Sequence, residues 1–447
     1  MKTTKLFFMA ALALMTAACS NDDNDLTQQP AKAEGIPFTA TISLDQSATT
    51  RALTENGTTI EATWATGEKV ALIYTVSATT YLKEAEVTPQ GDGTATISTT
   101  LEGSPADDTD VTIVYPASAV DGTTKDVKTD LLASQNGLLT GTGSIAEKYE
   151  LRKTTTPAKL KIDGTTASLK GTVSLTNQNA IFKLTLKDID GANDVSATSV
   201  VISDQTGVVT TVTPASGYEN AMYVALPTTA TTLKFLVTGS DSKKYFNMAS
   251  SLSLGASYYQ STVKLATVGD VILSTGKCAK AGTSGAVAKI CYLGDETGES
   301  AYNYTNGLAL AMSDANSGSK CQWKTLQTDA GHTYKPNSST FTEESGLQYN
   351  AMHNSDEYPA FKAAIANNDI AAPTGCSSWF LASGYQWTKM IDAAGGYNNL
   401  GLESGGLYWS SSERHAKLAW YFSSFDGNWY RGNKDDLDYL VRSCLAF

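Results

Sequence analysis

The chain has 447 residues, 41% of them hydrophobic, and carries a net charge of −12 at pH 7. This length predicts about three domains with hydrophobic cores, and the acidic balance argues against a nucleic-acid partner, because phosphate binding needs basic patches. The three histidines are scattered, and no glycine-rich phosphate loop, HExxH or CxxC pattern occurs. We therefore expect no metal site, no cofactor and no enzymatic activity.

Residues 1–18 have the pattern of a signal peptide. Lys2 and Lys5 precede an apolar run from Leu6 to Ala18, which is too short to span a bilayer comfortably. The small residues before Cys19 resemble a bacterial lipobox, which implies a precursor held in the outer membrane by lipid on Cys19. The acidic run at 20–25 resembles the surface-export signal of some Gram-negative lipoproteins. The alternative is an ordinary secretory signal with an incidental cysteine. No later segment is apolar enough to cross a membrane.

The segment from Ile36 to Leu44 alternates apolar and polar residues. A period of two predicts a β-strand with one buried and one exposed face, and its apolar side chains are Ile36, Phe38, Ala40, Ile42 and Leu44. Arg51 follows in a polar segment that we expect to be exposed and suited to proteolysis. Arginine is rare in this chain, so Arg51 is the best candidate for a cut before Ala52. The alternative is an incidental loop arginine.

Residues 36–265 are rich in Thr, Ser, Val and Gly, and short β-prone runs alternate with turn clusters. This organisation is typical of an all-β sandwich. Besides the first strand, the predicted strands are Lys69–Val76, Val111–Tyr115, Ala180–Leu186, Ser199–Ile202, Tyr223–Ala225, Leu233–Val237 and Tyr258–Leu265.

Five motifs in this part of the chain resemble the fimbrillin-like family in content and order. They are Trp64–Val70, Val114–Ser118, Ser174–Ala180, Val224–Pro227 and Leu254–Tyr259. The resemblance implies two transthyretin-like β-sandwich domains, at 52–150 and 151–268, and assembly into type V pili. It also implies that residues 19–51 are a tether and a removable first strand, cut off by an arginine- or lysine-specific protease. The groove left behind would accept a donor strand from another pilin subunit.

Residues 269–447 have a different composition and form a third predicted domain. Every cysteine after Cys19 lies here, and export past an oxidising compartment permits disulfides. The candidates are Cys278, Cys291, Cys321, Cys376 and Cys444, so at most two bridges form and the connectivity stays open. The predicted helices are Thr305–Ala315, Tyr358–Ala366 and Tyr385–Ala394, and the predicted strands are Gly406–Ser410, Ala419–Phe425, Asn428–Arg431 and Tyr439–Phe447.

Four motifs in this third part resemble the bacterial "WSSTE…VR" domains of surface proteins. They are Gly307–Ala315, Trp379–Ser383 with Trp387, Tyr408–Glu413 and Val441–Phe447. The resemblance implies an α+β C-type-lectin-like domain that serves adhesion, at the end of a chain that is otherwise mainly β. The "EPN", "QPD" and "WND" motifs of calcium-dependent lectins are absent, so a calcium–sugar site is not supported.

Near the end of the chain, aromatic and polar residues alternate in a way that could form a ligand-binding face. Sugar rings stack on exposed aromatics, while carboxylates and amides bind the hydroxyls; the candidates are Trp420, Asp426, Asn428, Trp429 and Tyr430. The alternative is that aromatics such as Trp409 and Trp420 belong to the core. Glu413 with Asp426 could be read as paired carboxylates for hydrolysis, although nothing in the sequence fixes their separation.

Together these features predict a tip subunit of the fimbrium, assembled by donor-strand exchange and presenting its last domain to a glycan or protein on a host or bacterial surface. The final strand, Tyr439–Phe447, is expected to belong to that domain's own sheet, so the subunit would accept a donor strand and not give one. The first alternative is a permanently anchored surface lipoprotein that binds glycan or protein. The second is a secreted enzyme acting on polysaccharide.

Overall fold

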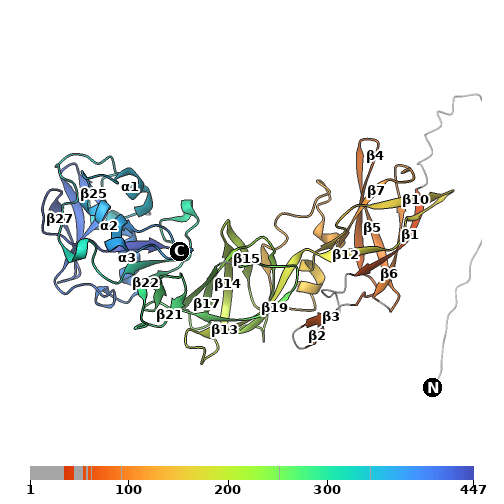
Figure 1. Ribbon diagram of the computed structural model, residues 1–447, viewed down its shortest axis with the longest axis horizontal. Helices are drawn as coiled ribbons and strands as arrows, with labels where there is room; N and C mark the ends of the chain where they lie inside the picture. The colour runs from red at the N-terminus through yellow and green to blue at the C-terminus, as the bar shows by residue number, and fades with distance from the viewer. Residues whose placement is uncertain are drawn as a thin grey trace, which may run out of the picture.

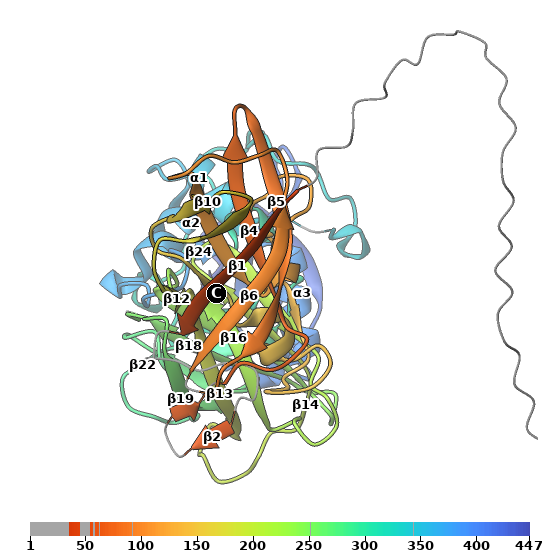
Figure 2. The same cartoon turned by 90° about the vertical axis from the view of Figure 1, so that its right-hand side faces the viewer.

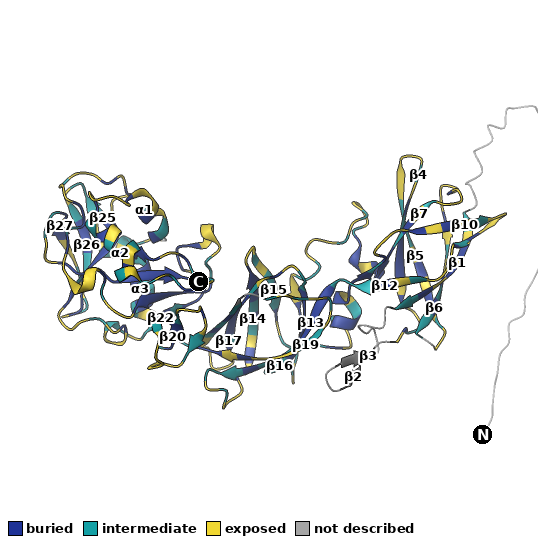
Figure 3. Ribbon diagram, in the orientation of Figure 1, coloured by how far each residue is buried: buried dark blue, intermediate teal, exposed yellow. Residues whose placement is uncertain are grey.

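The computed structural model describes residues 35–44, 54–56, 59–61, 63–91, 93–250, 252–342 and 344–447. The predicted lipidation site at Cys19 and the predicted cleavage site at Arg51–Ala52 lie outside these residues. The fold is mainly β, as predicted, and three domains follow one another along the long axis of the molecule (Figure 1). Within each domain the inward faces of the sheets are buried (Figure 3). No helix in the described part is long and apolar enough to cross a bilayer.

The first domain is a sheet that folds back on itself around one core. The described strands run in the order β10-β11-β1-β12-β9-β7-β4-β5-β6, and further pairings join β1 to β6 and β10 to β7. Their bounds are β1 (Ile36–Leu44), β4 (Lys69–Val76), β5 (Thr79–Pro89), β6 (Thr94–Leu101), β7 (Asp110–Tyr115), β9 (Arg152–Lys153), β10 (Ala158–Asp163), β11 (Thr166–Leu169) and β12 (Val173–Asn177). A separate hairpin joins β2 (Thr54–Asn56) to β3 (Thr59–Glu61).

The first domain extends beyond the predicted boundary at residue 150, and that prediction is wrong. Strand β10 pairs with β7, and β11 and β12 pair with β1, so residues 158–177 return to the first sheet. Conversely, β8 (Ser134–Gln135) precedes residue 150 but pairs with a strand of the second domain. The boundary therefore lies near Asn177. Long-range strand pairing decides which domain each segment joins, and the composition does not change at this point, so composition could not locate the boundary.

The second domain is a sandwich of two sheets, as predicted. One sheet has the order β16-β13-β19 and the other β18-β17-β14-β15-β8. Side chains from both, including Leu184, Val200, Val224 and Val237, share one core. The strands are β13 (Asn179–Asp188), β14 (Ala197–Asp204), β15 (Gly207–Val212), β16 (Ala221–Pro227), β17 (Thr232–Gly239), β18 (Lys244–Ser250) and β19 (Tyr258–Leu265).

The third domain contains both helices and strands. A sheet with the order β21-β20-β22-β23-β28-β24 lies beside a smaller sheet, β25-β26-β27. The strands are β20 (Val271–Leu273), β21 (Cys278–Ala279), β22 (Ala286–Leu293), β23 (Gly307–Ala311), β24 (Phe380–Leu381), β25 (Leu407–His415), β26 (Leu418–Ser423), β27 (Trp429–Asn433) and β28 (Ser443–Ala446). The helices are α1 (Gly346–Met352), α2 (Pro359–Ala366) and α3 (Gly384–Ala393).

Short helical turns lie between the strands and helices of the chain. They are η1 (Ala117–Ala119), η2 (Ile145–Tyr149), η3 (Ser300–Tyr302), η4 (Asn316–Gly318), η5 (Ser338–Thr340), η6 (Asn367–Asp369) and η7 (Tyr397–Asn399).

Two of the three predicted helices of the third domain are confirmed, and the first is wrong. Helix α3 begins with a capping box between Ser383 and Gln386, the kind of start signal that sequence carries. The predicted helix at 305–315 is instead strand β23, which lies between β22 and β28 with every residue buried. A short apolar run buried on both faces has no alternation, so periodicity cannot separate strand from helix there.

The cysteines of the third domain are all free thiols, so the predicted disulfides do not form. Cys291 lies on β22 and Cys444 on β28, and β23 runs between those two strands. Two strand spacings separate such residues by roughly 10 Å, and a disulfide requires Cα atoms within about 7 Å. The domain therefore depends on its core and not on bridges.

Candidate functional site

Strand β1 occupies an interior position in the first sheet. It pairs antiparallel with β6 from Ile36↔Leu101 to Ser43↔Thr94, and the two strands lie side by side in Figure 2. Along its other edge it pairs in parallel with β11 at Phe38 and with β12 from Ile42 onward. Removing β1 would therefore leave unpaired backbone groups on both sides of a single gap.

The side chains of β1 alternate as the sequence predicts. Phe38, Ala40 and Ile42 are 1%, 8% and 0% exposed and belong to the core of the first domain. Ile36 and Leu44 pack against the same core from the two ends of the strand. Removing β1 would thus open an apolar groove whose pockets follow a large–small–large order.

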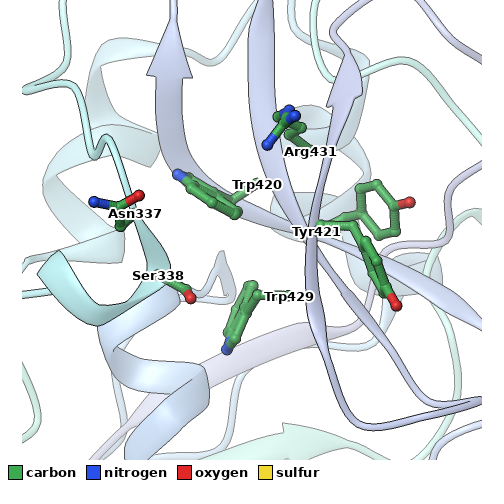
Figure 4. Close-up of a pocket in the computed structure, with 7 residues that line it drawn as sticks. Asn337, Ser338, Trp420, Tyr421, Trp429 and Arg431 are labelled. Carbon is green, nitrogen blue, oxygen red and sulfur yellow. The ribbon is translucent and has the colours of Figure 1, made fainter.

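The second candidate site is the edge of the smaller sheet in the third domain. In the β26–β27 hairpin Trp420 lies opposite Arg431, Tyr421 opposite Tyr430, and Phe422 opposite Trp429. Because side chains alternate between the faces of a strand, Trp420, Trp429 and Arg431 share one face, and the two tyrosines share the other. Figure 4 shows the first three on the side of Ser338, with Tyr421 pointing away from them.

A cavity of about 520 Å³ wraps around this edge. Its lining is Asn337, Ser338, Trp420, Tyr421, Trp429, Tyr430 and Arg431. The structure thus brings three of the predicted ligand-binding residues together, although Tyr430 lies on the opposite face of the hairpin from the two tryptophans. Sequence reasoning missed Asn337 and Ser338, which lie at the start of the helical turn η5, far from this hairpin in the sequence. Period-two alternation from Trp429 would have found Arg431.

The two tryptophans of the cavity are held differently. Trp420 is 6% exposed, and its indole Nε1 donates to the carbonyl oxygen of Lys335 at 2.8 Å. It is therefore largely a core residue, as the alternative interpretation has it. Trp429 is half-buried, with the ring of Phe341 packed edge-on against it at 4.8 Å between centroids and that of Phe422 at 5.5 Å.

Asp426 and Asn428 lie in the turn between β26 and β27 and do not line the cavity. The Asp426 carboxylate accepts hydrogen bonds from the Tyr430 hydroxyl at 2.5 Å and from the backbone N–H of Asn428 at 3.2 Å. These bonds, that of Tyr430 first, lower the pKa of Asp426 to about 2. The Asp426 carboxylate is therefore occupied by hydrogen bonds within the turn, and it is poorly placed to bind a ligand in the cavity.

Glu413 is not arranged as one of a pair of hydrolytic carboxylates. It is fully buried, its carboxylate accepts from the backbone N–H groups of Ala330 and His332, and it forms an ion pair with buried Lys434. Asp426 stands in the exposed turn at the other end of the hairpin. Glu413 therefore organises the interior of the domain.

Two of the histidines, distant in the sequence, meet inside the third domain. His332 Nε2 lies 2.7 Å from His353 Nε2, and both side chains are buried. Burial, more than any other cause, lowers the pKa of His332 to about 3 and that of His353 to about 4. At neutral pH both rings are uncharged and share one hydrogen bond. In the part of the chain that the structure describes, no three His, Cys, Asp or Glu side chains are grouped to hold a metal ion.

Comparison with known proteins gives only remote likenesses. No protein-family model matches the chain, and no curated protein sequence matches it. Among solved structures it is similar to a fimbrial protein from Bacteroides ovatus ATCC 8483, at 13% identity and a TM-score of 0.32 over 93% of this chain and 99% of that one. It is also similar to a fimbrial assembly protein from Parabacteroides distasonis ATCC 8503, at 14% identity and a TM-score of 0.30 over 51% and 90%. Likenesses this remote do not assign the chain to a family.

Proposed function

We propose that this protein is a tip subunit of a type V fimbria, assembled by donor-strand exchange, whose third domain binds a glycan or protein on a host or bacterial surface. The observation that carries the proposal is strand β1, which fills the core of the first domain and is paired along both edges. In the proposal the precursor reaches the outer membrane through lipid on Cys19. Cleavage after Arg51 then leaves β1 held by non-covalent contacts alone.

The groove that β1 occupies has the properties of a strand-acceptor site. Strands β6, β11 and β12 would supply backbone hydrogen bonds, and the pockets of Phe38 and Ile42 would fix the register of an incoming strand. The natural partner is another pilin subunit that contributes an extended segment with large apolar residues at alternate positions.

Strand β28 supports a position at the tip. This strand pairs with β23 on one side and β24 on the other, and Cys444, Leu445 and Ala446 are fully buried. Withdrawing it to serve a neighbouring subunit would dismantle the main sheet of the third domain. In the proposal, β28 therefore stays in its own domain when the groove of β1 receives a strand from another subunit.

The experiment is the N-terminal sequence of the protein sheared from the cell surface. A start at Ala52 is expected, together with co-purification of a second subunit in the β1 groove. Arg51→Ala should leave the terminus upstream and prevent incorporation into fibres, while Lys32→Ala, which removes a basic residue upstream of β1, should change neither. A lipidated Cys19 terminus on the sheared wild-type protein would instead identify an anchored surface lipoprotein and refute the tip proposal.

A further inference from the structure

Arg431 is the charged group of the cavity in the third domain, and its side chain has no partner among the residues that the structure describes. It is exposed on β27, the edge strand of its sheet, and no ion pair or hydrogen bond joins its guanidinium to any described residue. Two other arginines behave differently: buried Arg152 pairs with Glu150 at 2.8 Å, and buried Arg442 with Asp314 at 2.6 Å. In a chain with a net charge of −12, a guanidinium without a carboxylate is available for an anionic ligand.

The acidic residues closest to Arg431 in the sequence are already engaged elsewhere. Asp426 accepts from the Tyr430 hydroxyl, Asp435 from Gln327 at 2.7 Å, and Asp436 from Asn433 at 3.2 Å. The residue directly across the hairpin is Trp420, which is apolar and buried. The site is therefore electrostatically complementary to a negative group that comes from outside the protein.

The neighbours of Arg431 favour a sugar as the carrier of that negative group. Trp429 shares its face of the strand and is half-buried, with Phe341 and Phe422 fixing the orientation of its ring. Asn337 and Ser338 stand across the cavity and can donate and accept hydrogen bonds. An aromatic platform with amide and hydroxyl groups around it is the chemistry that stacks on a sugar ring and binds its hydroxyls.

We infer that this cavity binds a saccharide that carries a carboxylate, such as a hexuronic acid, with Arg431 binding the carboxylate and Trp429 stacking on the ring. The guanidinium can form two parallel hydrogen bonds with a carboxylate, which are stronger than bonds between neutral groups. A neutral sugar would leave Arg431 without a partner. The inference rests on the proposed adhesive function and specifies its ligand.

The test uses two matched probes, an oligosaccharide of hexuronic acids and the same oligosaccharide after its carboxyl groups have been reduced to alcohols. Binding to the purified full chain is measured by titration calorimetry at 0.15 M salt. We expect the acidic form to bind at least about tenfold more tightly than the reduced form, since one charge-assisted bidentate contact is lost on reduction.

Four variants test the two contacts and separate that of Arg431 from a general charge effect. Arg431→Gln should lower the affinity for the acidic probe to that for the reduced one, and Arg431→Lys should retain part of the difference. Lys417→Ala removes the same charge from an exposed position in the other turn of this sheet, and it should change nothing. Trp429→Ala should weaken the binding of both probes. The melting temperature of each variant checks that the variant folds.

Equal affinity for the two probes, or an Arg431→Gln loss no larger than that of Lys417→Ala, would overturn the inference. Binding of neutral sugars alone would also overturn it, while leaving the proposed adhesive role intact. If neither probe binds, the inference is wrong. The assembly mechanism is tested separately, by the N-terminal sequence of the sheared protein.

Discussion

The rings of Phe246 and Phe447 pack against each other across the boundary between the second and third domains, with their centroids 4.6 Å apart. Phe246 lies on β18 and Phe447 follows β28, and both are fully buried. Their core cluster includes Met248 from the second domain and Leu445 from the third. The two domains therefore share a hydrophobic core, and a force applied to the third domain passes directly into the second.

Substituting Phe447→Ala should destabilise the junction. Removing a buried phenylalanine costs about 3–5 kcal/mol, because apolar contact is lost and a cavity remains. We expect chemical denaturation to show a loss of this size and limited proteolysis to cut near residues 266–270. Phe425→Ala is the control, since this side chain is 80% exposed, and it should stay within about 0.5 kcal/mol of wild type. Equal effects of the two substitutions would show that the junction carries little stability.

Strand β1 gives a prediction that depends on the state of maturation. Ile42→Ala should destabilise the first domain of the precursor by about 2–5 kcal/mol, because Ile42 is fully buried. Thr41→Ala, on the exposed face of the same strand, should have almost no effect. The unfolding free energies are compared in the precursor and in protein cleaved after Arg51.

After cleavage and exchange, the difference between Ile42→Ala and wild type should vanish, since β1 is no longer part of the fold. If Ile42→Ala remains as destabilising in the surface-assembled protein as in the precursor, β1 has not been replaced and strand exchange is wrong.

Local pattern located several strands correctly. Strands β1, β4 and β19 match their predicted ranges, and in β1 the alternation reports one buried face directly. The failures come from long-range pairing: β23 is buried on both faces, and β10 to β12 return to a sheet begun far earlier. The candidate cavity divides in the same way. The prediction included Trp429 and missed Arg431, which alternation places on the same face of the same strand, whereas Asn337 and Ser338 reach the cavity only through tertiary folding.

The contact between His332 and His353 predicts a dependence of stability on pH. In the unfolded chain a histidine binds a proton near pH 6.5, but in the folded protein the two pKa values lie at about 3 and about 4. As the pH falls below 6.5, the histidines bind protons in the unfolded state but not in the folded state, so the free energy of unfolding falls. The slope approaches about 1.4 kcal/mol per pH unit for each histidine, and it ends near the folded pKa values.

The measurement is the unfolding free energy of the third-domain transition between pH 4 and pH 8. His353→Gln should reduce the loss of stability between pH 6.5 and pH 4 relative to wild type. His415→Gln, which alters a histidine outside this contact, should leave the profile unchanged. Identical profiles for wild type and His353→Gln would show that the buried pair does not set the acid sensitivity.

The free thiols predict that reductant has no effect on stability. Burial raises the pKa of Cys291 to about 12 and that of Cys321 to about 11, so neither thiolate forms appreciably at pH 8. We expect slow alkylation of these cysteines in the native protein, rapid alkylation in denaturant, and the same melting temperature with and without dithiothreitol. A drop in melting temperature on reduction would reveal a disulfide and contradict the structure.

The buried pair of Glu413 and Lys434 predicts a structural and not a catalytic role for Glu413. Glu413→Gln would leave the Lys434 ammonium buried without its counter-ion, and breaking such a pair by removing one partner costs about 3–5 kcal/mol. The control is Glu84→Gln, which breaks the exposed pair with Lys69 and should cost less than about 1 kcal/mol. Because the penalty comes from an uncompensated charge, replacing Lys434 with Met in the Glu413→Gln background should recover part of the loss. A Glu413→Gln protein of wild-type stability that had lost activity on a polysaccharide would overturn this interpretation, since only a chemical role would then explain the residue.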